Sequence, residues 1–165
     1  MKVREQVVIF PDIHFPHEDK KALSCALAVL EYVKPKSFLL LGDFAENEEA
    51  SHWKYQKVKR PRLEDQLKFI DEELELVNKG LDLIDESCKK ARVKYKICTE
   101  GNHEIWLKNL CDEHPYLKRQ YMPKIAFKMN ERGYSYHPYG KYIKIRNSKL
   151  WAYHGGHYNG VNHPR

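Results

Sequence analysis

Side chains that can bind metal ions follow four separate apolar segments of this 165-residue chain. The four groups are Asp12 with His14, Asp43, Asn102 with His103, and His154 with His157. Carboxylates, an amide oxygen and imidazoles without a thiolate motif suit Mn²⁺, Fe or Zn²⁺ better than a copper site or a structural zinc site. A carboxylate such as Asp43 can bridge two ions, and two ions about 3.5 to 4 Å apart can hold the attacking and leaving oxygens of a displacement at phosphorus. These residues therefore predict hydrolysis of a phosphate ester by hydroxide formed from water that two metal ions activate.

The pattern of apolar residues predicts the elements that bring these groups together. Segments 7–10, 37–41 and 94–99 are short and mainly apolar, and each predicts a buried strand. Residues 18–33 carry an apolar stripe at helical spacing, with Glu18 and Asp19 where the helix dipole favours acids. Strand, helix and strand in this order indicate a parallel βαβ unit, and the carboxyl ends of such strands meet in one crevice. We therefore expect the four groups to form a single site.

The remaining sequence predicts further helices and a second set of strands. Residues 63–88 have apolar side chains at steps of three and four, which predicts a helix that Gly80 either bends or divides. Residues 105–132 are compatible with helix, with breaks at Pro115 and Pro123. Residues 134–137, 142–145 and 150–153 predict three short strands. We expect residues 1–165 to form one domain, because a chain of this length buries about two-thirds of its unfolded surface.

Composition excludes several classes of protein. The four cysteines, Cys25, Cys88, Cys98 and Cys111, form no CxxC pair and follow no apparent secretory signal, which argues against zinc ribbons and disulfide frameworks. Scattered thiols of this kind indicate a reducing, cytoplasmic compartment. The longest apolar runs are far shorter than the roughly 20 residues that cross a bilayer. We therefore expect a soluble protein with no membrane partner.

A basic segment lies between the second predicted strand and the 63–88 helix. Five cations and no acid occur between Trp53 and Leu63, interleaved with aromatic rings. The cations are Lys54, Lys57, Lys59, Arg60 and Arg62. The segment from Lys54 to Arg62 is interpreted either as an arm that contacts the phosphates and bases of a nucleic acid, or as an exposed linker before a helix.

Four motifs resemble a known family. Asp12-x-His14, Gly42-Asp43-x-x-Glu46, Gly101-Asn102-His103-Glu104 and the late His154 are similar to the successive motifs of the calcineurin-like metallophosphoesterases, in particular the small bacterial or phage phosphoesterases. The resemblance implies an α/β/β/α sandwich with a charged helical insertion over about residues 46–92. It also implies two divalent metal ions, for which we expect Mn²⁺.

The resemblance further implies a role for each matched residue. Asp12 and His14 would bind the first metal ion, Asp43 would bridge both ions, and Asn102 and His154 would bind the second. His103 would contact the phosphate and help the leaving oxygen to take a proton. Glu46 lies where the family usually has an aspartate that hydrogen-bonds this histidine, and such a pair fixes the tautomer and favours the charged ring.

Two departures from the family pattern qualify these expectations. The closing Gly-His-x-His motif does not occur, so either the chain is a fragment, which we favour, or His157 and His163 replace the missing ligands. Asn47 follows Glu46, and Glu100 precedes the Gly101 motif, where protein phosphatases have arginine; this disfavours a phosphoprotein phosphatase. The expected activity is hydrolysis of a phosphate mono- or diester, as a phosphatase or a nuclease-like enzyme. The alternative is an impaired scaffold that binds a nucleic acid or a protein.

Overall fold

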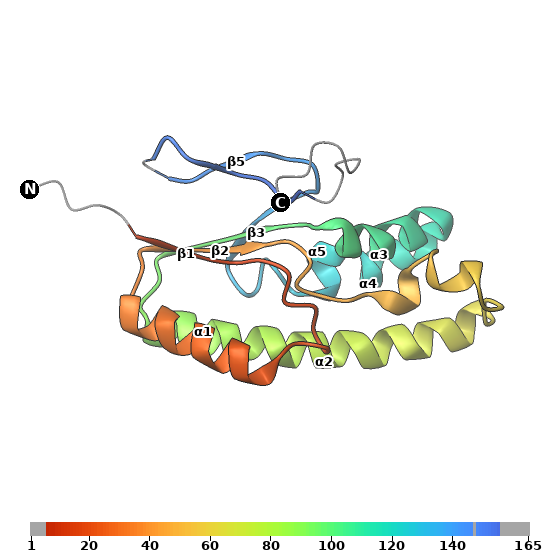
Figure 1. Cartoon of the computed structure of the whole chain (residues 1–165). Coiled ribbons are helices and arrows are strands. Elements are labelled where there is room, and N and C mark those ends of the chain that lie inside the picture. The colour runs from red at the N-terminus through yellow and green to blue at the C-terminus, as the bar shows by residue number, and fades with distance from the viewer. Residues whose placement is uncertain (1–5, 147, 156–165) are drawn as a thin grey trace, which may run out of the picture.

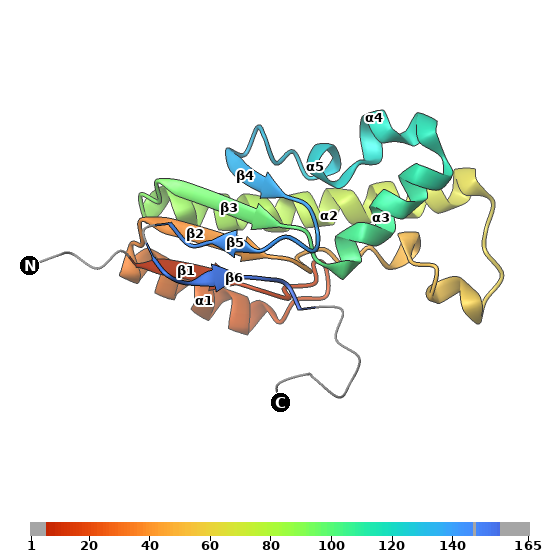
Figure 2. The same ribbon diagram turned by 90° about the horizontal axis from the view of Figure 1, so that it is seen from above.

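A parallel sheet of four strands forms the centre of the computed structural model, which describes residues 6–146 and 148–155. Its strands are β1 (Val7–Phe10), β2 (Ser37–Leu41), β3 (Tyr95–Thr99) and β4 (Tyr134–His137), and they pair in the order β1-β2-β3-β4. All three pairings are parallel, so the carboxyl ends of the strands lie at one edge of the sheet (Figure 2). The prediction of parallel strands is confirmed, whereas burial along nearly the whole strand holds only for β2, and β1 and β3 are partly exposed.

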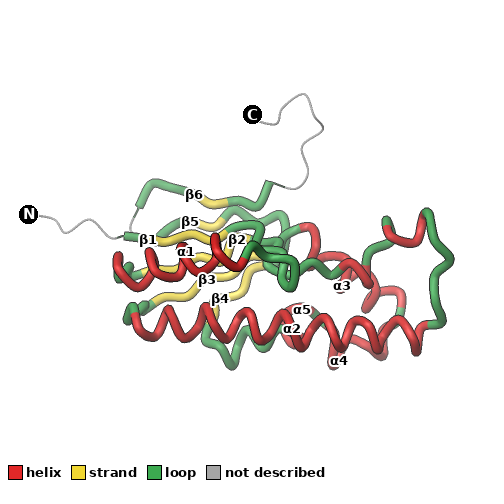
Figure 3. The backbone as a smooth tube through the Cα atoms, turned by 60° about the horizontal axis from the view of Figure 1, so that its bottom comes forward, coloured by secondary structure: helices red, strands yellow, loops and turns green. Residues whose placement is uncertain are grey.

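Two long helices cover one face of this sheet, as Figures 1 and 3 show. Helix α1 (Lys20–Val33) begins later than residue 18, because the side chain of Asp19 accepts hydrogen bonds from the N–H groups of Lys21 and Ala22 and caps the helix. Helix α2 (Leu63–Lys90) runs without interruption through Gly80. A Cβ atom at Gly80 would lie 2.5 Å from the ring of Phe15, so this glycine makes room for the ring and does not divide the helix.

The buried side chains of the helices and the sheet form one core. Phe38 and Leu40 of β2 are fully buried in it, as are Val77 and Leu81 of α2 and Leu30 of α1. Complete burial of an aliphatic or aromatic side chain of this size contributes about 1.5 to 3 kcal/mol, so this core holds the strands that position the site.

A two-stranded antiparallel sheet lies over the opposite face of the main sheet (Figure 1). Strands β5 (Ile143–Lys144) and β6 (Trp151–Ala152) are shorter than the predicted segments 142–145 and 150–153. Ile145 and Ala152 pack against Leu39 of β2, which joins the two sheets. The described residues thus supply an α/β fold with one helical layer and two sheet layers. Within them, no helix covers the outer face of β5 and β6, and Trp151 there is 61% exposed.

The other segments are short helices around the site. Helix α3 (Asn102–Glu113) follows β3 directly, and α4 (Lys118–Tyr121) and α5 (Pro123–Ala126) follow it. The 3₁₀ turns are η1 (Glu48–Ala50), η2 (Lys54–Gln56) and η3 (Pro115–Leu117). Pro115 and Pro123 each begin a new helical segment, which confirms the predicted breaks. None of the helices in the described ranges has the length and apolar character needed to cross a membrane.

Candidate functional site

The loops that follow β1 and β2 run side by side and bring three predicted ligands together. The N–H of Asp12 donates to the carbonyl of Gly42 at 3.2 Å, and the N–H of His14 donates to the carbonyl of Asp43 at 3.0 Å. Asp12, His14 and Asp43 all have left-handed backbone, with φ of 51°, 55° and 47°. Such conformations cost roughly 1 to 3 kcal/mol each and persist only where surrounding contacts enforce them. The paired loops supply those contacts.

The first group of potential ligands consists of Asp12, His14 and Asp43. One ligand atom from each lies within 4.8 Å of the others. Asp12 is exposed, whereas Asp43 is buried. Burial raises the pKa of Asp43, but hydrogen bonds from His154 and from the N–H of His103 outweigh burial and keep this pKa below its ordinary value. Asp43 is therefore an ionised carboxylate at the centre of the site, with the character expected of a metal ligand.

The second group consists of Asp43, Asn102 and His154. His154 Nδ1 donates to the carbonyl of Leu41 at 2.9 Å. His154 Nε2 lies 3.2 Å from Asp43 Oδ2 and 3.1 Å from Asn102 Oδ1. In the neutral ring Nδ1 carries the hydrogen, so Nε2 would then face two acceptor oxygens without a donor.

That arrangement calls for a positive charge at Nε2, from either a proton or a metal ion. A proton meets the requirement: burial lowers the pKa of His154, but the hydrogen bond and charge of Asp43 more than offset burial and raise this pKa to about 9. A divalent metal ion would meet it equally, because carboxylate, amide oxygen and neutral imidazole are all ligands of Mn²⁺, Fe and Zn²⁺. The donor set present therefore fits a metal ion at this point.

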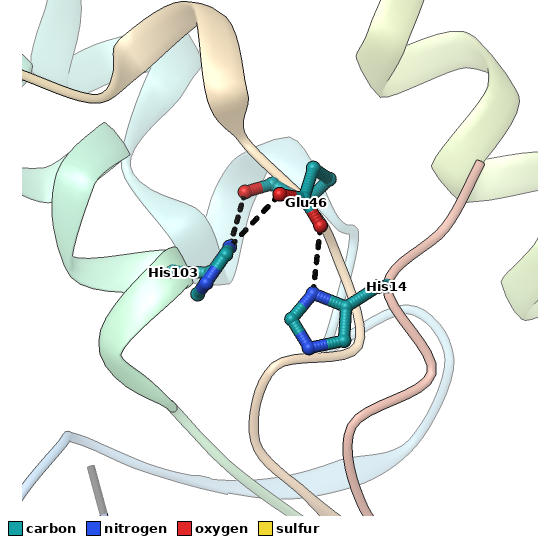
Figure 4. Close-up of side chains that lie close together, drawn as sticks. All are labelled: His14, Glu46 and His103. Carbon is teal, nitrogen blue, oxygen red and sulfur yellow. Dashed lines mark hydrogen bonds and ion pairs between the residues drawn. The ribbon is translucent and has the colours of Figure 1, made fainter. Parts of the chain in front are cut away.

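Glu46 links two histidines of the site, as Figure 4 shows. Its carboxylate accepts a hydrogen bond from His14 Nδ1 at 2.7 Å. Its backbone carbonyl accepts a hydrogen bond from His103 Nδ1 at 2.6 Å, while its carboxylate oxygen Oε1 is 3.7 Å from that nitrogen. The family resemblance placed the carboxylate hydrogen bond on His103. In this structure the carboxylate bonds to His14, and His103 is held by the main chain of Glu46.

His103 lies at the start of α3 in a tightly packed position. Its ring is 4.0 Å from the ring of Trp106 and stands edge-on to the ring of His14 at 4.6 Å, measured between centroids. Its backbone N–H donates to Asp43 Oδ1 at 2.9 Å. Since Nδ1 is occupied by Glu46, the second ring nitrogen, Nε2, is the one that can exchange a proton with a substrate.

Glu46 and the two histidines that it contacts form another possible set of metal ligands. Ligand atoms of His14, Glu46 and His103 also lie within 4.8 Å of one another. The hydrogen bonds of Glu46 account for this proximity without a metal ion, and they leave Nε2 of His14 available as a ligand. We therefore assign Glu46 to orientation of the two histidines.

Glu104 is a site residue whose role the sequence did not reveal. It is fully buried, and its carboxylate accepts hydrogen bonds from the N–H groups of Asp43, Ala45 and Gly101 at 2.9, 3.0 and 2.6 Å. Burial and the charge of Asp43 raise the pKa of Glu104 to about 8, although the three N–H groups favour the ionised form. Glu104 therefore holds the loop after β2 against the start of α3. The sequence did contain one sign of this role: Glu104 lies three residues after Gly101, which is the spacing of a capping box.

Two glycines allow the close approach of these loops. At Gly101 a Cβ atom would overlap Oδ1 and the backbone nitrogen of Asp43, and at Gly42, where φ is +71°, it would lie 2.6 Å from His154 Nδ1. The structure therefore brings together Asp12, His14, Asp43, Glu46, Asn102, His103 and His154 at the carboxyl edge of the sheet. His157 and His163 lie outside the described residues.

Comparison with known proteins agrees with this geometry. A family model described as calcineurin-like phosphoesterase matches residues 6–165. Comparison with curated proteins and with solved structures gives no match. The family model spans nearly the whole chain and all four groups of site residues, and the chain therefore belongs to the calcineurin-like phosphoesterase family.

Proposed function

We propose that this protein hydrolyses a phosphate mono- or diester with the help of two divalent metal ions. Members of its family are metal-dependent phosphoester hydrolases. The observation that carries the proposal for this chain is the convergence of Asp43 Oδ2 and Asn102 Oδ1 on His154 Nε2, three ligand atoms that suit a divalent ion. Mn²⁺ is the ion we favour, and Fe or Zn²⁺ suits the same ligands.

The ligands divide into two sets that share Asp43. Asp12 and His14 would hold one ion, Asn102 and His154 would hold the other, and His157 is a further candidate. When bound, two such ions polarise the phosphate oxygens and lower the pKa of water to near neutrality. The carboxylate of Glu46 keeps the His14 ring fixed by its hydrogen bond to Nδ1, which would leave Nε2 free to bind an ion.

His103 would serve the phosphate and not a metal ion. The backbone carbonyl of Glu46 holds its Nδ1 hydrogen, and the rings of Trp106 and His14 fix the plane of the imidazole. The Glu46 carboxylate lies 3.7 Å from the same nitrogen. With Nδ1 held in this way, Nε2 is the nitrogen that would pass a proton to the leaving oxygen.

The first experiment measures hydrolysis of a monoester and a diester with Mn²⁺ present. We expect turnover, and preference for one ester separates a phosphatase from a nuclease-like enzyme. Absence of turnover by protein with confirmed metal content would refute the proposal and favour the scaffold that binds a partner without catalysis.

A second experiment separates ligation from proton transfer. His103→Ala should lower turnover roughly 100-fold or more while the metal content stays the same, because a positioned general acid contributes about 10² to 10⁴. His114→Ala, at the other end of α3, is the matched control and should leave both quantities unchanged. Loss of metal from His103→Ala would show that His103 is a ligand.

We also propose a substrate class, a cellular compartment and a domain organisation for this protein. The basic segment from Lys54 to Arg62 favours a polynucleotide as the diester, which agrees with a nuclease-like role. All four cysteines are free, in keeping with a cytoplasmic protein. We further propose that residues 1–165 form one domain with an insertion over about residues 46–92. The side chains that α2 buries in the same core as the sheet support this.

A further inference from the structure

The segment between η1 and α2 lies beyond the carboxyl ends of the strands, next to α3 (Figure 2). Five of its residues are cations and none is an acid, counting from Trp53 to Leu63. The structure divides these cations into two that pair with acids, Lys54 and Arg60, and an outer set of three that face solvent without such a partner in the described residues.

Glu49 binds the side chains of Lys54 and Tyr55. Its carboxylate accepts hydrogen bonds from Lys54 Nζ at 2.5 Å and from the hydroxyl of Tyr55 at 2.7 Å. Its carbonyl accepts a hydrogen bond from Gln66 Nε2 of α2 at 2.7 Å. Lys54 is therefore neutralised and Tyr55 is fixed, so neither is available to a ligand.

Arg60 ties the segment to α3. Its guanidinium lies 5.4 Å from the centre of the Tyr55 ring and 3.4 Å from the carboxylate of Glu113, the last residue of α3. Helix α3 starts at the proposed metal site with Asn102 and His103. At a rise of about 1.5 Å per residue, Glu113 is roughly 15 Å from His103 along the helix.

The outer set consists of Lys57, Lys59 and Arg62, and Trp53 precedes them in the same segment. All three cations are exposed and form no ion pair with any residue in the described ranges. The side chain of Trp53 is 59% exposed and its ring lies 4.5 Å from the ring of His52. An exposed indole and uncompensated cations within one short segment are the combination that binds single-stranded nucleic acids, in which cations contact phosphates and rings stack on bases.

We propose that this outer face, formed by Trp53, Lys57, Lys59 and Arg62, binds the backbone of a single-stranded polynucleotide whose scissile phosphodiester lies in the metal site. The proposal rests on the phosphoesterase function proposed above. With about 3.4 Å per nucleotide in a stacked strand, 15 Å corresponds to about four to five nucleotides, and fewer in an extended strand. The face would therefore contact phosphates several nucleotides from the bond that is cleaved.

The test compares two triple variants. The first, Lys57→Gln with Lys59→Gln and Arg62→Gln, removes the outer cations. The second, Lys34→Gln with Lys89→Gln and Arg92→Gln, removes three equally exposed cations near the amino ends of β2 and β3. Binding is measured by fluorescence anisotropy with a labelled, phosphorothioate-substituted 20-nucleotide single strand at several salt concentrations. Hydrolysis is measured with bis(p-nitrophenyl) phosphate and with an unmodified 20-nucleotide strand.

The first variant should bind the strand at least about tenfold more weakly, and the slope of log K against log salt should fall by about 2, since each lost phosphate contact contributes roughly 0.7. Trp53→Ala should weaken binding roughly tenfold with the slope unchanged. The ratio of strand hydrolysis to small-diester hydrolysis should fall in the first variant and stay constant in the second.

Equal affinities and slopes for the two triple variants would overturn the assignment of this face. Equally tight binding of poly-glutamate, with the same loss in the first variant, would also overturn it, since the face would then select any polyanion. If the wild type hydrolyses neither substrate but the first variant alone loses strand binding, the phosphoesterase proposal fails while the binding face stands.

Discussion

Replacement of Gly101 by alanine tests the geometry on which the metal site depends. A Cβ atom at this position would overlap Oδ1 and the backbone nitrogen of Asp43, the carboxylate shared by both proposed ion sites. Neither atom can yield easily. The nitrogen donates to Glu104 at 2.9 Å and Oδ1 accepts from the backbone of His103 at 2.9 Å.

The expected magnitude follows from that overlap. Asp43 must withdraw until the new contact reaches an ordinary distance of at least 3.4 Å. Metal ligands must hold their positions to within about 0.5 Å, and a displacement of about 1 Å in a site can cost roughly 100-fold in rate. Forcing an extra methyl group into a packed region also costs about 1 to 3 kcal/mol of unfolding free energy. Gly101→Ala should therefore lose metal, turnover and stability together.

Gly155→Ala is the matched control, because a Cβ atom there has no neighbour within 4 Å among the described residues, although Gly155 adjoins His154. Metal content by elemental analysis, turnover with Mn²⁺ and unfolding in urea should all stay close to wild type in this control. A Gly101→Ala protein that keeps its metal content and its turnover at the level of Gly155→Ala would refute the proposed placement of Asp43.

Three further changes test other parts of the structure. Gly80→Ala should lower the unfolding free energy by about 1 to 3 kcal/mol in urea titration, because the buried Phe15 ring fills the space, and a gain in stability would contradict this packing. Burial raises the pKa of Glu73 from 4.5 to about 7, so stability should decline as pH rises through this range. Glu73→Gln should remove at most about 3 kcal/mol of that decline, and an unchanged pH slope would show that Glu73 titrates normally. Chelation of metal should lower the melting temperature, since an ion at 100 times its Kd contributes about 2.7 kcal/mol, and Mn²⁺ should restore it in proportion to log concentration. A melting temperature that does not change with the concentration of Mn²⁺ would argue against a metal site at Asp43 and His154.

Periodicity predicted the main elements because burial determines both the sequence pattern and the structure. The continuous apolar run at Ser37–Leu41 became the second strand with the same bounds, since both faces of this strand are covered. The ends of elements depended on single side chains and were less predictable. Asp19 caps α1 and shifts its start, and Gly80 accommodates Phe15 where its type suggested a break.

Topology accounts for three of the four groups of site residues. Parallel strands must place their carboxyl ends at one edge, so the ordered motifs were sufficient to predict that Asp12, Asp43 and Asn102 lie near one another. His154 follows β6 of the antiparallel two-stranded sheet, so its place at the same edge depends on how that sheet packs on the main one. The roles of the individual residues follow from the family resemblance and stay predictions.

Side-chain partners were the part that sequence could not determine. Glu46 has a carboxylate and a carbonyl, and both are within reach of a histidine once the loops converge. Which acceptor bonds to His14 and which to His103 depends on differences in loop position of about 1 Å, and motif spacing carries no information at that scale. The same holds for Glu104, whose three N–H partners come from two loops separated by about sixty residues of chain.

The stretch from Gly101 to Glu104 shows why this site needs four consecutive residues with four different functions. Gly101 leaves space for Asp43, and Glu104 fixes that loop by accepting its N–H groups. Asn102 turns its amide oxygen to His154, while the backbone of His103 bonds to Asp43 and its ring bonds to Glu46. Because helix α3 begins at Asn102, all these groups are placed by one rigid element. A shift of α3 would therefore disturb both proposed ion sites and the proposed acid at once, which predicts strongly non-additive effects for paired substitutions in this stretch.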